Sequence, residues 1–272
     1  MEKQENRVIE VMESLKNIYS SLWAAVLLIF PLTCLAHFNH EKWDRLLKDH
    51  VISIRDGQVT QVDYDGFLKN KRILDNYLAD LSAVGRADFD SWEKSEQLAF
   101  LINAYNAWTI QVVLERYPDL ESIREIGLFP FSVWRRRVVE LFGDRYSLDG
   151  VEHEMIRGSG LFEEPRIHFS LNCAAVGCPA LRPEAYVGAR LSQQLEDNTK
   201  LFLTDKSRNY FKDETLYVSR IFDWYREDFE KGWLGVDSVC QFLNAYREQL
   251  GINLDSNFCL QTNDIRLNYL DY

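Results

Sequence analysis

The densest group of chemically reactive side chains lies between residues 153 and 178 and contains His153, His168, Cys173 and Cys178. Cys173 follows an alternating apolar run and begins a segment of small residues. A thiol at such a position meets free backbone N–H groups, which stabilise a thiolate and can receive an oxyanion. An imidazole in contact with the sulfur would complete an activated nucleophile. The pattern predicts a hydrolase or acyltransferase acting on an amide, ester or peptide bond, with Cys173 as nucleophile.

His153 is the predicted general base, because it comes from a separate helix and can contact Cys173. His168 is expected on the strand that leads into Cys173, with its side chain one or two residues down that strand. Asn103 and Asn106 share a helix face, so either could orient the imidazole, as an asparagine does in papain-like enzymes. The small-molecule or peptide substrate is expected to meet four further residues, Arg157, Arg166, His168 and Glu184. This interpretation requires no metal and no cofactor.

Three other interpretations fit the same residues. Cysteine is often buried and inert, so the cluster could be a structural knot in a non-catalytic binding or scaffold domain. Its arginines would then pair with Glu152 or Glu184. His153, His168, Cys173 and Cys178 could instead form a His2Cys2 metal site, although their spacing is looser than the Cys-x2-Cys pairs typical of zinc. A Cys173–Cys178 disulfide across the Gly177 turn is the third alternative.

The elements that must position this cluster mix helices and strands. The clearest is an apolar helix over 92–117, which Ser91 could cap. A short helix capped by Ser147 or Asp149 is expected to carry His153. Further helices are predicted near 43–51, 67–81, 190–203, 222–229 and 237–250, and strands at 59–64, 138–142, 145–148, 166–171 and within 210–218.

These elements show no regular βαβ alternation, so they predict an α+β domain with helices around a small, mostly antiparallel sheet. A distant papain-like or transglutaminase-like arrangement is one version of this fold. The order of the predicted groups along the chain is Asn, His, Cys. Because those enzymes have the order Cys, His, Asn or Asp, a rearranged topology would be needed.

Long motifs through most of the chain resemble the domain of unknown function 547 family. They are Phe100 to Ala107, Ser147-Leu148, Glu152-His153, Ile156-Arg157, Arg166 to Cys173, Gly177 to Pro179, Leu181 to Tyr186, Ile221-Phe222, Trp224-Tyr225, Asp228-Phe229 and Asn268 to Tyr272. The resemblance implies a shared fold and marks the functional cluster, but it brings no established reaction. Plant relatives of the family often lack the second cysteine and keep the first, which implies a role for Cys173 that does not need Cys178.

The N-terminal segment, residues 1–36, predicts export. An apolar run over 22–30 is followed by Pro31 and by small residues suited to cleavage after Ala36. The run is too short for a comfortable membrane span. An uncleaved anchor, the only membrane contact expected, is the alternative, and Met12 could be the true start. We therefore expect a periplasmic or secreted protein, or one anchored outside the cytoplasm.

Composition supports one domain over 37–272. The hydrophobic fraction of 46% and the aromatic fraction of 13% suffice for a sizeable core, and no linker or repeat divides the chain. The net charge of −11, with no extended basic cluster, argues against nucleic acid as a partner. In an oxidising compartment, a Cys240–Cys259 bridge could clamp the C-terminus.

Overall fold

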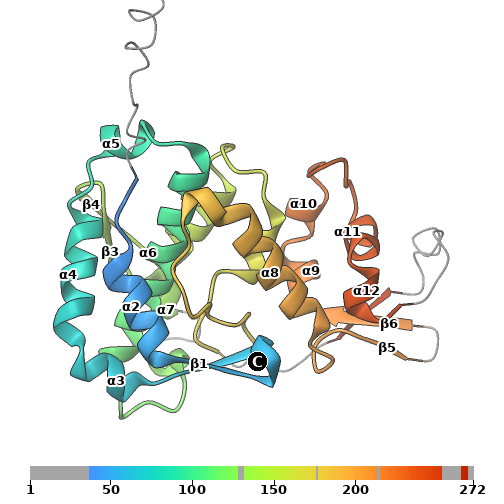
Figure 1. The fold of residues 1–272 in the computed structure, drawn as a ribbon, viewed down its shortest axis with the longest axis horizontal. Coiled ribbons are helices and arrows are strands. Elements are labelled where there is room, and N and C mark those ends of the chain that lie inside the picture. Colours follow the sequence, from blue (N-terminus) through green and yellow to red (C-terminus); the bar gives the residue numbers. More distant parts are fainter. Residues whose placement is uncertain (1–36, 128–131, 176, 213–214, 253–264, 269–272) are drawn as a thin grey trace, which may run out of the picture. The chain divides into compact units, whose positions relative to one another are not determined.

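A long apolar helix, α6 (Lys94–Leu114), is the element around which the core is built (Figure 1). Nearly all of its residues are buried, as expected for a helix that is hydrophobic on every side. The predicted cap at Ser91 is wrong. The Ser91 hydroxyl donates to the Asp88 carbonyl at the end of α5 (Arg86–Asp90) instead, and Glu93 precedes α6.

The computed structural model describes residues 37–127, 132–175, 177–212, 215–252 and 265–268. The predicted signal segment, 1–36, and Cys259 lie outside the described residues. Cleavage, anchoring and the Cys240–Cys259 bridge therefore stay predictions. In the part of the chain that is described, every helix is too short or too polar to span a membrane.

Helices from both sides of α6 in the sequence complete this core. α4 (Lys71–Ser82) and α8 (Leu191–Thr204) pack on α6, and α2 (Glu41–His50) and α3 (Tyr64–Lys69) pack against α4. The segment before α6 supplies some of the largest buried side chains of this core, among them Trp43, Phe67 and Tyr77. Trp43 stacks on Tyr77 with ring centroids 5.8 Å apart. Residues 37–88 are thus an integral part of the core.

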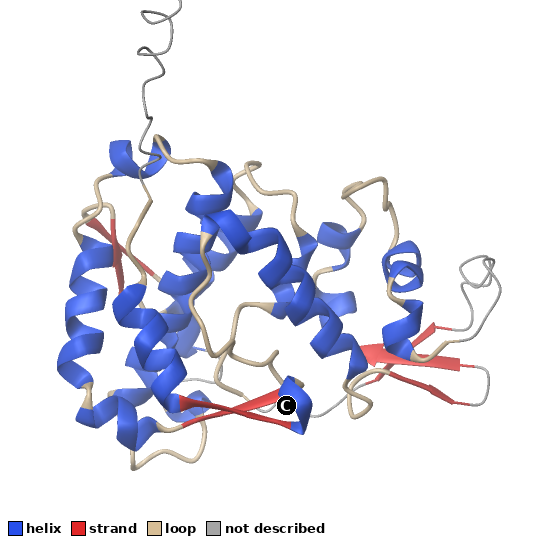
Figure 2. Ribbon diagram, viewed as in Figure 1, coloured by secondary structure: helices blue, strands red, loops and turns tan. Residues whose placement is uncertain are grey.

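Among the described residues the strands are short and form three separate small sheets (Figure 2). β1 (Val51–Ile54) pairs with β2 (Val59–Val62), and β3 (Val139–Leu141) pairs with β4 (Asp144–Tyr146), both antiparallel. β5 (Tyr210–Lys212) pairs antiparallel with β6 (Thr215–Ser219), which also pairs in parallel with β7 (Ile265–Asn268). The predicted α+β class is confirmed, as are the strands predicted near 138–148 and within 210–218, and no single sheet organises the described part of the chain.

A second core is formed by the C-terminal helices. They are α9 (Ile221–Trp224), α10 (Arg226–Phe229), α11 (Val239–Ala245) and α12 (Arg247–Leu250). Their aromatic side chains pack on Phe169, which brings the predicted functional cluster to this core. Shorter elements include η1 (Arg55–Gly57), η2 (Ile123–Glu125), α7 (Ser132–Arg135) and η5 (Gly188–Arg190).

The strand predicted over 166–171 is wrong, because the segment forms a 3-10 helix, η4 (Pro165–Phe169). Pro165 occupies its first turn, where a missing N–H costs nothing. The Glu164 side chain accepts a hydrogen bond from the Arg166 backbone N–H and caps the turn. Every residue of η4 is buried, so the apparent alternation does not separate an inner from an outer face.

The carboxylate of Glu96, near the start of α6, joins two distant segments. It accepts hydrogen bonds from the backbone N–H of Phe38 at 3.1 Å and of Gly188 at 3.0 Å. A Cβ on Gly188 would lie 2.9 Å from the Glu96 backbone. Glycine is therefore required at 188, because any side chain would push this segment away from the helix.

Buried His40 should make the fold sensitive to acid. Its Nδ1 lies 2.7 Å from the Tyr77 hydroxyl, and burial lowers the pKa of His40 from 6.5 to about 3. Since the unfolded state binds this proton more readily, stability is complete above pH 6.5 and is lost as pH falls toward 3. Between pH 7 and pH 5, His40 should account for a loss of about 2 kcal/mol in the free energy of unfolding.

Urea unfolding at both pH values would measure this loss. The His40→Gln variant should lose about 2 kcal/mol less than the wild type on acidification, whereas exposed His37→Gln should follow the wild type. Equal losses in wild type and His40→Gln would contradict a neutral His40.

Candidate functional site

A cavity of about 250 Å³ lies where the two cores meet. Tyr105 and Leu171 reach it from the α6 core, and Ile221 and Tyr225 reach it from the C-terminal core. The other lining residues are Arg124, Trp134, Arg135, Asp149, Glu152, His153, His168, Cys173, Ala175, Gly177, Cys178, Pro179 and Trp224. The fold thus brings His153, His168, Cys173 and Cys178 to one cavity.

One wall is a wide, π-type helix, η3 (Gly150–Arg157). The Ser147 hydroxyl caps the turn that leads into this helix, because it accepts a hydrogen bond from the Gly150 N–H at 2.9 Å. Asp149 and Glu152 also line the cavity, and burial raises the pKa of Asp149. Helices of this type are rare and occur often at functional sites, where they re-aim side chains.

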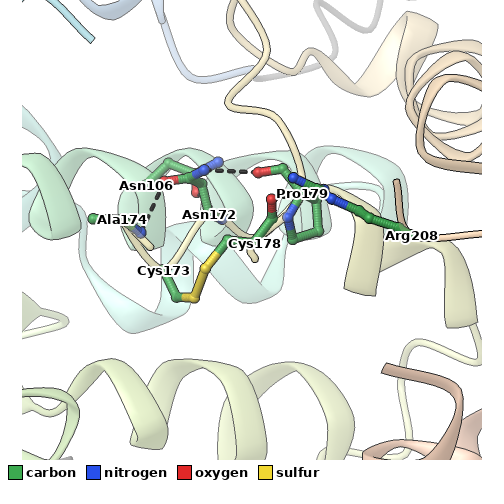
Figure 3. The surroundings of a disulfide bond; sticks show 7 residues. All are labelled: Asn106, Asn172, Cys173, Ala174, Cys178, Pro179 and Arg208. Atoms are coloured by element: carbon green, nitrogen blue, oxygen red, sulfur yellow. Dashed lines mark hydrogen bonds between the residues drawn. A yellow bond between two sulfur atoms is a disulfide. The ribbon is translucent and has the colours of Figure 1, made fainter. Parts of the chain in front are cut away.

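Cys173 and Cys178 form a disulfide in the wall of the cavity (Figure 3). Cys173 is half-buried and Cys178 is buried. A sulfur in a disulfide has no ionisable thiol, so in this state Cys173 lacks the group that a nucleophile needs. The alternative of a Cys173–Cys178 bridge describes this structure, and Cys173 does not act apart from Cys178 in it.

The loop around the disulfide is also held by hydrogen bonds from Asn172 (Figure 3). Its side-chain nitrogen donates to the Pro179 carbonyl at 2.7 Å, and its side-chain oxygen accepts from the Ala174 N–H at 3.0 Å. Ala174 has a φ of 57°, a left-handed conformation that is unfavourable for alanine. The Asn172 contacts offset this strain, so the loop shape does not depend on the disulfide alone.

Asn103 and Asn106 hold backbone and do not orient His153. Asn103 donates to the Tyr186 carbonyl at 2.7 Å and accepts from the Tyr186 N–H at 3.0 Å. Asn106 donates to the Ser170 carbonyl at 3.0 Å and accepts from the Asn172 N–H at 2.9 Å. Both amides are fully engaged in fastening loops to α6.

His153 lies on the rim of the cavity with its side chain 41% exposed. Arg157 Nη1 lies 2.9 Å from His153 Nδ1, and a guanidinium can only donate. Nδ1 therefore accepts, so the neutral ring carries its proton on Nε2. With Nδ1 engaged by Arg157 and the proton on Nε2, neither ring nitrogen of His153 has a free lone pair to act as a base in this arrangement.

His168 is buried beneath Tyr225 and oriented by a carboxylate. Its Nε2 lies 2.8 Å from Asp228 Oδ2, and its ring stacks on Tyr225 with centroids 3.8 Å apart. Burial lowers the pKa of His168 in spite of this hydrogen bond. A neutral His168 therefore donates from Nε2 to Asp228.

Asp228 is the centre of an ionic network beneath the cavity. Besides His168, it binds Arg157 and, at 2.7 Å, Lys231. Burial opposes ionisation, but hydrogen bonds from His168, Arg157 and Lys231 prevail and hold the pKa of Asp228 well below its usual range. The Arg157 guanidinium lies 4.8 Å from the Tyr225 ring, so Tyr225 is packed between two partners of Asp228.

Two residues predicted for the pocket lie elsewhere. Arg166 binds Glu164 at 2.7 Å and Glu196 at 3.2 Å, with its guanidinium over the Trp233 ring. Glu184 binds Arg182 and Arg190 and borders a different cavity, of about 340 Å³. Arg157 does not line the site cavity but contacts His153, which does.

The metal interpretation has no suitable donor set. The two sulfur atoms are bonded to each other, and the two histidine nitrogens described above face Arg157 and Asp228. In the predicted His2Cys2 site the ligands would have to be free thiolates and imidazole lone pairs. Within the described ranges, no group of three or more His, Cys, Asp or Glu side chains is arranged to hold a metal ion.

Asp228, Tyr225 and Tyr105 were not predicted as site residues. Tyr105, Tyr225 and Asp228 nevertheless lie in the motifs quoted for the family resemblance. The missing signal is spatial, because Asp228 is 60 residues from His168 in sequence. Only the folding of α10 against η4 brings them together.

Comparison with known families is informative for the middle of the chain. Residues 89–203 match the family described as "Protein of unknown function, DUF547". This segment, less than half of the chain, is similar to the DUF547 family. The resemblance expected from the motifs is thus confirmed, and the DUF547 segment supplies every lining residue of the cavity except Ile221, Trp224 and Tyr225. No curated protein and no solved structure matches the chain, so a papain-like arrangement gains no support.

Proposed function

We propose that this protein is a non-catalytic ligand-binding domain whose cavity receives a small molecule or the end of a peptide. The observation that carries the proposal is the disulfide in the cavity wall, which uses the sulfur that a thiol enzyme would need. The cavity otherwise has the character of a binding site, since aromatic walls surround a few oriented polar groups.

The disulfide also supports an extracytoplasmic location. Disulfides persist in oxidising compartments and are rare in the reducing cytosol. Together with the apolar N-terminal run over 22–30, the Cys173–Cys178 bond favours a periplasmic or secreted protein, or one anchored outside the cytoplasm.

A fragment screen followed by NMR of the labelled protein tests the binding proposal. We expect hits to shift the indole N–H signals of Trp134 and Trp224, which line the cavity. The Trp224→Ala variant should weaken those hits, because this indole is 48% exposed and its removal should not disturb the fold. Hits scattered over other surfaces, with none at the cavity, would contradict the proposal.

Iodoacetamide labelling separates this proposal from the thiol enzyme predicted from sequence. In unreduced folded protein, Cys173 should remain unlabelled at neutral pH, because the disulfide leaves no thiolate. After mild reduction it should become labelled, since it is the more exposed of the two cysteines. Stoichiometric labelling without reductant would instead support a thiol nucleophile.

Removing the disulfide should have a modest effect on stability. The Cys173→Ser/Cys178→Ser double variant should lose about 2 kcal/mol, because the bond closes a short loop. The Asn172 hydrogen bonds remain in this variant and should preserve the loop. Urea unfolding measures the change, and a variant that no longer folds would show that the loop depends on the disulfide.

A further inference from the structure

Glu152 is a buried carboxylate at the cavity without a cationic partner in the described part of the chain. Its side chain is only 9% exposed, and it lines the cavity. Its one ion-pair contact among the described residues is with His153 Nδ1, at 3.9 Å. That nitrogen accepts a hydrogen bond from Arg157, so in this arrangement it carries no proton to neutralise the carboxylate.

Two tyrosine hydroxyls hold the Glu152 carboxylate in place. Tyr105 and Tyr225 both hydrogen-bond to it, and burial, reinforced by this neighbouring charge, raises the pKa of both hydroxyls. The tyrosines therefore stay protonated and donate. Tyr225 cannot swing away easily, because it is packed between His168 and Arg157. The carboxylate is thus fixed, but its charge is not compensated.

Arg124 and Arg135 are the arginines that line the cavity among the described residues. Arg135 is largely exposed and lies 3.7 Å from Asp149 Oδ2, so this arginine and Asp149 offset each other. The indoles of Trp134 and Trp224 add two π-systems to the wall. A fixed carboxylate beside aromatic rings is the arrangement that favours an organic cation.

This inference rests on the proposed binding function. We propose that the ligand carries an ammonium group, which supplies the missing counter-charge for Glu152. The group would lie against the indole wall with the carboxylate behind it. A charged amine satisfies both features at once, whereas a neutral ligand leaves the buried carboxylate uncompensated.

A matched pair of probes isolates the charge. Choline and its neutral carbon isostere, 3,3-dimethylbutan-1-ol, have nearly the same shape. Ligand-observed NMR titration against the full protein should give a dissociation constant at least roughly tenfold lower for choline. The isosteric Glu152→Gln variant should abolish that preference. Glu154→Gln, an exposed position on the same helix, should preserve it.

Each outcome decides the inference. Equal binding of the two probes, absence of choline binding up to about 10 mM, or a preference that survives in folded Glu152→Gln would overturn it. If Glu152→Gln fails to fold, Trp224→Ala replaces it and should weaken choline more than the isostere. Binding of the neutral probe at the cavity without any charge preference would refute the ammonium inference but leave the binding function intact.

Discussion

Replacing Asp228 with asparagine should lower the free energy of unfolding by about 3 kcal/mol, because it removes one partner of a buried ionic network. Asp228 is buried and binds His168, Arg157 and Lys231. An asparagine has the same shape, but it leaves the Arg157 charge without its carboxylate. Urea unfolding at pH 7 measures the loss.

The pH dependence gives this prediction a second readout. Since the network depresses the pKa of Asp228 in the folded state, its contribution is complete above the ordinary value of 3.8 and is lost as pH falls below it. The difference between wild type and Asp228→Asn should therefore shrink in that range. Asp223→Asn, the same substitution at a more exposed position, is the control. Equal stabilities of the wild type and Asp228→Asn at pH 7 would contradict the network.

Truncating Asn103 to alanine should cost about 3 kcal/mol. The substitution leaves the backbone N–H and carbonyl of Tyr186 unpaired in the interior, and each unpaired buried group costs roughly 1–3 kcal/mol. Asn103 is itself completely buried, so water cannot replace the amide without entering the core. Chemical denaturation would report the loss directly.

Thr109→Ala on the same helix is a matched control. Thr109 is also buried, but its hydroxyl donates to a carbonyl of its own helix, at Tyr105. Its removal leaves no distant backbone unpaired, so the cost should remain near 1 kcal/mol. Comparable losses for the two variants would show that side-chain volume, and not the Tyr186 tie, determines the effect of Asn103→Ala.

Much of the fold was predictable where periodicity and turns agree. The apolar run of α6 and the Phe142-Gly143 turn between β3 and β4 both act through local physics. The alternation of residue types wrongly predicted a strand at η4, because every residue there is buried and the alternation does not separate an inner from an outer face. The pairing of β7 with β6 depends on contacts between distant segments, which no local pattern encodes.

At the site, the sequence correctly concentrates attention on the segment that lines the cavity. The residue types of His153, His168 and Cys173 fit several chemistries, and only geometry separates them. From its residue type alone, a cysteine can be a free thiol or half of a disulfide. A histidine can be a general base or can have both ring nitrogens engaged, and only the position of Arg157 beside His153 separates these cases. Charge balance at Glu152 is likewise invisible until Tyr105 and Tyr225 are brought to it.

The two backbone hydrogen bonds that the Glu96 carboxylate accepts determine where this chain can be truncated. They tie residues 38 and 188 to the first turn of α6, and the large aromatic side chains before α6 complete the core. A fragment trimmed to 89–203 would expose the face on which Trp43 and Phe67 pack, and would leave Phe169 without its C-terminal neighbours. Expression work should therefore retain the flanks on both sides, because the boundaries of the matched segment cut through two hydrophobic cores.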